Sequence, residues 1–388
     1  MSRQYGNNVL DTLADLIRIN SINTNYQGGV NELEMAEYVE RFFQERGIET
    51  WRQAVFSDRP NVIARVPGLH PERRVVLEAH MDTVAVTGMT IEPWRPEVSD
   101  GKMFGRGACD TKGGMAAMMH AVANLVTSKT TPLCDVWFAA TIDEEYSFRG
   151  VVALCEPPFH ADAAIIAEPT DLQPVIASKG LVRWKIETLG KAAHSAKPHL
   201  GRNAIEHMAQ IIVAIQKDTI DLARRSHALL GPATCNIGVV RGGVQINFVP
   251  DRCEIEIDRR LLPGEHVSGV LSHYQALVDS VAKSHSGMQV VMHQPMLTDI
   301  PLETDPDATA VQTMVQVLRH FGLASTLSGV PFCSDASKFG AIGIPSIIFG
   351  PGSIDQAHSA IEFVSCNQVV KATEIYQKFI TDFQPLTH

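Results

Sequence analysis

Three apolar runs in this sequence each end directly at a cluster of acidic or histidine residues. They are residues 75–79 before His80, residues 136–141 before Asp143, Glu144 and Glu145, and residues 163–167 before Glu168. Such runs are typical of buried strands, and segments with helical periodicity alternate with them. This alternation predicts an α/β fold with a mostly parallel sheet, in which functional groups gather beyond the carboxyl ends of the strands. All three clusters stand at such strand ends, which makes them candidates for a functional site.

Helical segments flank these strands along the chain. Apolar residues recur at helical spacing over residues 9–17, and a second helix is predicted over residues 31–46. Asn31 is the expected N-cap of the second helix and Gly47 its stop. Further helices are predicted at residues 113–125, 308–321 and 367–383, with further strands at residues 61–66 and 345–349.

The pattern changes near residue 178. Two alternating, strand-like segments and two helical segments follow, at residues 181–189, 249–262, 203–216 and 266–284. Their order suits a small sheet with helices on one face. We therefore predict one α/β domain formed by residues 1–177 and 293–388, interrupted by an inserted α+β domain at residues 178–292. A chain of 388 residues agrees with two or three domains.

The composition is that of an ordinary globular enzyme, with 45% apolar and 20% charged residues. The net charge is -10 and no cluster of Lys and Arg stands out, so no nucleic-acid partner is expected. No apolar run reaches the length of a membrane span, and the polar first eight residues lack the apolar core of a signal peptide. The seven cysteines are odd in number and form no Cys-x-x-Cys pair, as in proteins of a reducing compartment. We expect a cytoplasmic protein without a membrane partner.

Five potential metal ligands are spread over the predicted α/β domain, namely His80, Asp110, Glu145, Glu168 and His358. Taken singly, each has an ordinary explanation, such as a helix cap or a solvated strand end. Together, imidazole and carboxylate ligands suit Zn, Co or Mn, and the lack of a cysteine ligand argues against a structural zinc site. Because a carboxylate can bridge two cations, five such residues can hold two metals and leave positions open for water.

Longer motifs around these residues resemble those of a known family. The motifs are HMDTV at 80–84, GRGACDTKGG at 105–114, DEE at 143–145, EPT at 168–170, GPG at 350–352 and HS at 358–359. Their order is similar to that in the dinuclear zinc amidohydrolases and exopeptidases. This family includes acetylornithine deacetylase, succinyl-diaminopimelate desuccinylase, aminoacylase-1 and carboxypeptidase G. The resemblance covers nearly the whole chain. It implies a metal-binding catalytic α/β domain and an inserted lid and dimerisation domain.

The resemblance also implies a role for each candidate ligand. His80 and Glu168 are expected to bind one metal. Glu145 and His358 are expected to bind the other, with Asp110 as the bridge between the two ions. Family members have a cis peptide bond after the bridging residue. The expected cofactors are two divalent ions per chain, most readily Zn, with Co or Mn as alternatives.

Two further acidic residues complete the expected catalytic group. By resemblance, Glu144 is the general base, which takes a proton from the attacking water and gives one to the leaving amine. Metal binding lowers the pKa of such a water towards about 7. Asp82 lies two residues after His80, and its carboxylate is expected to accept the second ring N–H of that histidine.

Three residues of the inserted domain match positions with roles in the family. His194 resembles the histidine that reaches across a dimer and supports the oxyanion in the partner's site. Asn247 and Arg260 match positions that bind the α-carboxylate of the substrate, and a guanidinium suits a carboxylate bidentately. Arg259 remains the alternative to Arg260, because neighbouring residues of a strand point to opposite faces. The resemblance implies a homodimer that forms through the lid domain.

The expected activity is hydrolysis of the amide bond of an N-acyl amino acid, as in acetylornithine deacetylase and succinyl-diaminopimelate desuccinylase. A dipeptidase or carboxypeptidase of the same family is the alternative, because a short peptide also presents an amide and a carboxylate. A metal-free binding protein with this fold is less favoured, since all five ligands and Glu144 are present. One departure from the family lies at residues 146–150, where a bulkier loop follows Glu145 in place of an early glycine.

Overall fold

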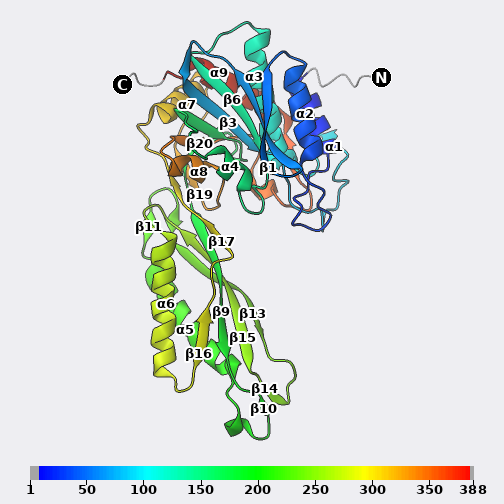
Figure 1. Cartoon of the computed structure of the whole chain (residues 1–388). Helices are drawn as coiled ribbons and strands as arrows, with labels where there is room; N and C mark the ends of the chain where they lie inside the picture. Colours follow the sequence, from blue (N-terminus) through cyan, green and yellow to red (C-terminus); the bar gives the residue numbers. More distant parts are fainter. Residues whose placement is uncertain (1–7, 385–388) are drawn as a thin grey trace. The chain divides into compact units, whose positions relative to one another are not determined.

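The computed structural model describes residues 8–384, which form two compact units (Figure 1). The first unit contains the chain up to Ile176, Thr304–Ser328 and the segment from Ser334 onward. The second unit contains Ala177–Glu303 and Gly329–Cys333. Residues 1–7, which belong to the polar start considered above, lie outside the described residues.

The first unit is built on a sheet whose four central strands are parallel, with antiparallel strands on either side. In spatial order the strands are β1 (Glu49–Phe56), β2 (Arg59–Val66), β6 (Cys134–Thr141), β3 (His70–His80), β7 (Ala163–Ile166), β20 (Ser346–Ile348) and β8 (Val175–Ser178). The parallel strands are β6, β3, β7 and β20. Their near-continuous apolar sequences suit strands that helices cover on both faces. The predicted α/β class is confirmed.

Seven helices of the described chain belong to the first unit. They are α1 (Val9–Arg18), α2 (Leu33–Gln44), α3 (Gly113–Thr127), α4 (Arg149–Leu154), α7 (Thr309–His320), α8 (Ala336–Ala341) and α9 (Cys366–Asp382). The helix α3 contacts β2, β3 and β6 and also packs against α1 and α9. It is apolar around most of its circumference, as expected for a helix enclosed on all sides. The helices predicted at 9–17, 113–125, 308–321 and 367–383 are confirmed to within two residues at each end.

The predicted start of α2 is two residues too early. Asn31 accepts the backbone N–H of Leu33 through its Oδ1 at 3.0 Å, but Glu32 occupies the N-cap position. Gly47 has a positive φ of 71°, the conformation that glycine adopts readily after a helix. The regular helix ends before it, at Gln44.

The second unit contains an antiparallel sheet with two helices packed on it. The sheet order is β13 (Thr234–Gly242), β15 (Arg252–Leu261), β9 (Gly180–Leu189) and β16 (Gln289–Met292), and β17 (Leu297–Asp299) also pairs with β9. The helices are α5 (Ala204–Leu222) and α6 (Val267–Ser284). Because β17 pairs with β9, residues 293–303 belong to this unit, although the sequence assigns them to the α/β domain. The helix α5 runs six residues beyond the predicted end at residue 216.

Short elements complete the described chain. The short strands are β4 (Glu97–Ser99), β5 (Lys102–Phe104), β10 (Ala193–His194), β11 (Ser226–His227), β12 (Gly231–Pro232), β14 (Phe248–Val249), β18 (Leu302–Glu303), β19 (Ser328–Val330) and β21 (Phe363–Ser365). Short helical turns span Ala108–Lys112, Pro198–Leu200 and Ile354–Gln356. Within residues 8–384, none of the helices combines the length and apolar character that crossing a bilayer requires.

Candidate metal centre

Three neighbouring strands of the first unit end at candidate ligands. His80 is the last residue of β3, Glu144 and Glu145 follow β6, and Glu168 follows β7. These strands are adjacent and parallel, so their carboxyl ends lie at the same edge of the sheet. Open α/β sheets bind ligands at this edge.

The two remaining candidate ligands reach the same place from loops. Asp110 lies in the helical turn Ala108–Lys112, immediately before α3, and His358 follows the turn Ile354–Gln356. The peptide bond between Asp110 and Thr111 is cis, as the resemblance implies. All five candidate ligands are therefore brought together by the fold of the first unit.

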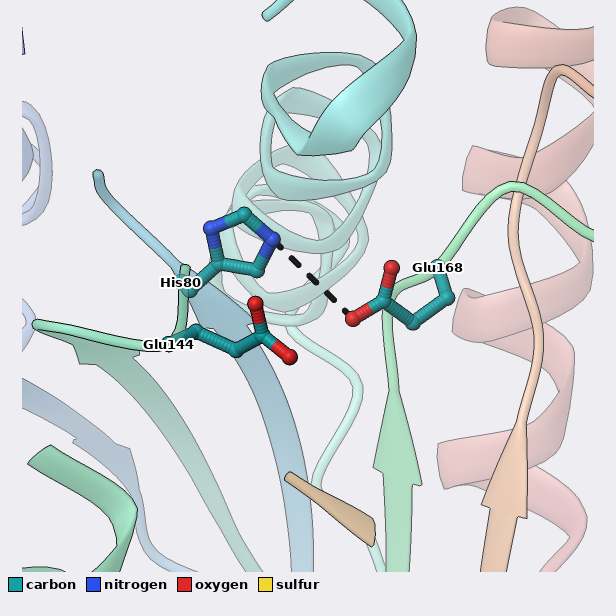
Figure 2. A group of neighbouring side chains, drawn as sticks. All are labelled: His80, Glu144 and Glu168. Atoms are coloured by element: carbon teal, nitrogen blue, oxygen red, sulfur yellow. Dashed lines mark ion pairs between the residues drawn. The ribbon is translucent and has the colours of Figure 1, made fainter. Parts of the chain in front are cut away.

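One group of donor atoms comes from His80, Glu144 and Glu168 (Figure 2). Their ligand atoms all lie within 4.8 Å of one another, and His80 Nε2 is 4.0 Å from a carboxylate oxygen of Glu168. Figure 2 shows the three side chains converging from separate strand ends. Zinc lies about 2 Å from each nitrogen or oxygen ligand, so donors separated by about 4 Å or less can share one ion.

A second group comes from Asp110, Glu145 and His358. His358 Nε2 lies 3.2 Å from Asp110 Oδ2 and 3.1 Å from Glu145 Oε2. The other oxygen of Asp110, Oδ1, lies 3.1 Å from His80 Nε2. The carboxylate of Asp110 therefore faces both groups, which is the geometry that a bridging ligand requires.

The electrostatics of the cluster also fit divalent cations. Burial raises the pKa of Glu144 and Glu168 well above the usual value. Burial and the nearby charge of Asp110 raise the pKa of Glu145 to about 7. Hydrogen bonds with Asp110 and Glu145 raise the pKa of His358 to about 11. Without metal ions, the raised pKa values favour the protonated forms of these carboxylic acids. Bound metal ions would replace those protons and supply the positive charge.

Asp82 supports the turn that carries the two glutamates. His80 Nδ1 lies 3.0 Å from the backbone oxygen of Asp82, while the Asp82 carboxylate is 3.6 Å away. That carboxylate accepts the backbone N–H groups of Glu144 and Glu145, at 3.1 Å and 3.2 Å. The hydrogen-bond partner of the histidine is thus the carbonyl of Asp82, and the carboxylate fixes the neighbouring turn.

Glu362 is a residue of the site that the sequence analysis missed. Its carboxylate is fully buried and accepts a hydrogen bond from Arg106 at 2.7 Å. It also accepts the backbone N–H groups of Gly107, Cys109 and Asp110, at 2.9, 3.0 and 3.1 Å. Glu362 thereby fixes the loop that presents Asp110. The available signal was Arg106, a charged residue between two glycines of the motif, because a buried guanidinium needs an acidic partner.

In the second unit, His194 and Asn247 lie close together. β10 pairs with β14, where His194 is opposite Phe248, and the backbone N–H of Ser195 donates to the backbone oxygen of Asn247 at 3.0 Å. The side chains of His194 and Asn247 are both exposed.

Arg260 lies on β15 of the five-stranded sheet, whereas β10 and β14 form a separate two-stranded sheet. β15 pairs with β9 so that Arg252 is opposite Leu189 and Arg260 is opposite Leu181. His194 follows the Leu189 end of β9, so about eight strand residues, or about 26 Å at 3.3 Å each, separate that end from Arg260. The structure therefore does not bring Arg260 to His194 and Asn247 within one chain.

The two neighbouring arginines have different surroundings. Arg260 is half-buried, with its Nε 2.8 Å from Asp258. Arg259 is 1% exposed and forms an ion pair with Glu265 at 2.6 Å. Arg260 is therefore the more accessible of the two.

Comparison with known proteins shows similarity along almost the whole chain. The sequence pattern of peptidase family M20/M25/M40 matches residues 76–382. An acetylornithine deacetylase from Myxococcus xanthus is 27% identical over 381 residues, which cover 96% of each chain. A probable succinyl-diaminopimelate desuccinylase from Staphylococcus aureus is 25% identical over 404 residues, with 95% of this chain and 96% of that protein covered. The crystal structure of a tripeptidase from Staphylococcus aureus superimposes with a TM-score of 0.81 at 21% identity, covering 96% of this chain and 97% of that one.

Proposed function

Because the chain belongs to peptidase family M20/M25/M40 and is a metal-dependent amidohydrolase, we propose that its substrate is an N-acyl amino acid. The observation that carries the proposal is the pair of donor groups at the carboxyl edge of the sheet, with Asp110 facing both. The deacetylase and desuccinylase named above are relatives that align along nearly all of this chain.

The proposed centre holds two divalent cations. His80 and Glu168 would hold one, and Glu145 and His358 the other, with Asp110 shared between them. When bound, the ions would polarise the amide carbonyl and lower the pKa of a bound water to about 7. Zinc is the proposed metal, and Co or Mn suits the same donors.

Glu144 is the proposed general base. Its carboxylate lies beside His80 and Glu168, and burial raises its pKa well above the usual value. In its ionised form it accepts a proton from the water whose oxygen attacks the amide carbon. It then gives that proton to the nitrogen as the carbon–nitrogen bond breaks, which leaves a carboxylic acid and a free amine. Asp82 holds the Glu144 backbone in place for both transfers.

The residues of the second unit are proposed to act in a homodimer. Arg260 and Asn247 would bind the substrate carboxylate, and His194 would donate to the oxyanion. Because His194 follows the Leu189 end of β9 and Arg260 pairs near the other end of that strand, a substrate that contacts both would take them from different chains. The exposed apolar side chains of Val244 and Ile246, 91% and 100% accessible, support an interface near His194.

We also propose the cytoplasm as the location of the protein. All seven cysteines are free thiols in the structure. Structural disulfides are rare in reducing compartments, so this cysteine usage supports the proposal.

A dipeptidase or carboxypeptidase activity is the second candidate, since the same centre suits a peptide bond. Purified protein loaded with Zn, Co or Mn in turn should be assayed on N-acetyl and N-succinyl amino acids, dipeptides and tripeptides. The proposal expects the highest kcat/KM on an N-acyl amino acid. A higher kcat/KM on peptides would favour the second candidate. No amide hydrolysis by protein that holds both metals would reject the first.

A further inference from the structure

We propose that Asn23 is a positioning residue of the catalytic centre, whose side-chain amide joins two acidic residues that hold the turn bearing Glu144 and Glu145. Asn23 lies between α1 and α2, outside every motif described above. The inference rests on the proposed function, in which Glu144 takes part in catalysis and Glu145 binds a metal ion. The chemistry of the amide contacts stands independently of it.

The amide of Asn23 makes one hydrogen bond to each of two carboxylates. Its Nδ2 lies 2.8 Å from Asp82 Oδ2 and 2.8 Å from Asp143 Oδ1. Its Oδ1 accepts the backbone N–H and the side-chain Nδ2 of Asn25, at 3.1 and 3.0 Å. Both ends of the amide are thus engaged, and its orientation is fixed by donors on one side and carboxylates on the other. The side chain is fully buried.

The carboxylates of Asp82 and Asp143 both belong to the structure of the turn after β6. Asp143 is the residue before Glu144 and adopts a left-handed φ of 67°. Asp82, in the loop after β3, accepts the backbone N–H groups of Glu144 and Glu145. By bonding to both aspartates, Asn23 fixes the distance between the loop that follows His80 and the turn that carries the two glutamates.

The segment around Asn23 is itself anchored to the same loops. The backbone N–H of Asn23 donates to the backbone oxygen of Thr83 at 2.9 Å, and that of Thr83 donates to Ser21 at 3.0 Å. The hydroxyl of Tyr26 donates to the backbone oxygen of Glu145 at 2.7 Å. This segment therefore hydrogen-bonds to both the loop after β3 and the turn after β6.

The surrounding charges explain why an amide is required at this position. Three neighbouring carboxylates are buried here, those of Glu32, Asp82 and Asp143, and two of them pair with the buried guanidinium of Arg59. Arg59 forms ion pairs with Glu32 at 2.7 Å and with Asp143 at 3.1 Å. The carboxylate of Asp82 receives its hydrogen bonds from Asn23 and from two backbone N–H groups. Buried charges left without hydrogen-bond donors are strongly destabilising. The amide of Asn23 supplies donors to two of these carboxylates without adding a charge.

Three substitutions separate this role from simple space filling. Asn23→Asp keeps the volume but replaces the NH2 group, which carries both N–H donors, with one oxygen and adds a fourth negative charge. Asn23→Ala removes the donors and leaves space for water to donate in their place. Asn23→Leu keeps the branching and the number of side-chain heavy atoms, in a larger side chain, without donors or charge. If Asn23 acts as a donor, Asn23→Asp is the most damaging change; if it only fills space, Asn23→Ala is.

The matched control is Asn124→Asp, which makes the same chemical change in a half-buried asparagine of α3 that donates to Gln377. The variants should be compared with wild type in three measurements on metal-loaded protein. These are kcat and KM for the best substrate, metal ions per chain, and the visible absorption spectrum of the Co(II) form. Circular dichroism establishes which variants are folded.

We expect kcat of Asn23→Asp to fall about 10²-fold, the scale of a misplacement of about 1 Å, with little change in KM. The Co(II) spectrum should change, because Glu145 moves with the turn, while Asn124→Asp should match wild type in every measurement. If Asn23→Asp does not fold, the same loss of kcat and change of spectrum are expected in Asn23→Leu. Wild-type kcat and spectrum in the folded Asn23 variants would overturn the inference. A wild-type protein that hydrolyses no amide would reject the proposed function, and the Co(II) spectra would still decide the role of Asn23.

Discussion

Glu144 and Glu145 are adjacent in sequence, yet their carboxylates belong to different donor groups. Glu144 lies with His80 and Glu168, while Glu145 lies with Asp110 and His358. Neighbouring side chains of the turn thus point to two sides of one centre. Substitutions at the two positions are therefore expected to have different effects.

The first prediction concerns Glu144. Replacing it with Ala should lower kcat by at least about 10²-fold, the scale of a lost general base, while the metal content stays at the wild-type level. Glu145→Ala, the matched variant, should lose metal instead. Elemental analysis and steady-state kinetics on both variants check this. Loss of metal from Glu144→Ala would identify Glu144 as a ligand and remove it from the proposed role.

The second prediction concerns pH and the metal-free protein. Burial raises the pKa of Glu145 from 4.5 to about 7, so its contribution to folding stability is present below pH 4.5 and is lost as pH rises through about 7. The pKa of His358 is raised from 6.5 to about 11, so the contribution of His358 to folding stability is complete below pH 6.5 and is lost as pH rises towards about 11. Metal ions bind the deprotonated ligands, so their stabilising effect increases over the same range.

The difference in Tm between metal-loaded and metal-free protein should therefore grow from pH 5 to pH 8. Scanning calorimetry of both forms at matched ionic strength measures it. A difference that stays constant or shrinks as pH rises would contradict the assigned ligands.

At the scale of elements, the sequence predicts most clearly those strands whose residues are buried on both faces. The central parallel strands are recognisable because helices cover both faces and leave continuous apolar runs. The strand β1 was not predicted, because it alternates between exposed and half-buried residues and carries several polar side chains. The location of the five ligands followed from strand ends and motifs that are local in sequence.

Contacts between segments far apart in the sequence could not be predicted from the sequence patterns. Glu362 and Asp110 are 252 residues apart, and Asn23 and Asp143 are 120 residues apart, so no spacing links them. The predicted contact between the Asp82 carboxylate and His80 was local, but the backbone carbonyl is the nearer partner. Only the folded loops determine which of these groups meet.

The third prediction concerns the loop that Glu362 holds. Glu362→Ala should destabilise the protein by about 3–5 kcal/mol, because it leaves the buried charge of Arg106 unpaired. It should also weaken metal binding, since the Asp110 backbone loses an acceptor. Glu374→Ala, which breaks an exposed pair with Lys371 on α9, should change stability by less than about 1 kcal/mol. Equal effects of the two variants in denaturant unfolding would refute the anchoring role.

At the scale of the whole molecule, the proposed site requires two chains. His194 and Arg260 are far apart in one copy of the second unit, and a two-fold pair is the commonest way to bring such positions together. Loss of one oxyanion donor costs about 10²–10³ in kcat, so His194→Ala alone should be nearly inactive.

The fourth prediction is that two inactive variants restore activity when mixed. In a dimer of His194→Ala with Glu144→Ala, one site has an intact Glu144 and receives His194 from the other chain. After subunit exchange, the activity of each mixed dimer should approach half that of wild type. Absence of recovery despite demonstrated exchange would mean that His194 does not act across the dimer. A fully active monomer would reject the assembly outright.

The central claim is that two metal ions on one chain form an amide-hydrolysing centre. Its most direct test is to titrate metal-free protein with Zn²⁺ while measuring both bound metal and the release of free amino acid from an N-acyl amino acid. The account predicts that hydrolysis rises with loading and reaches its plateau at about two ions per chain, the stoichiometry of a site with one bridging carboxylate. Saturation of binding at one ion, or two bound ions without hydrolysis of any N-acyl amino acid or peptide, would contradict it.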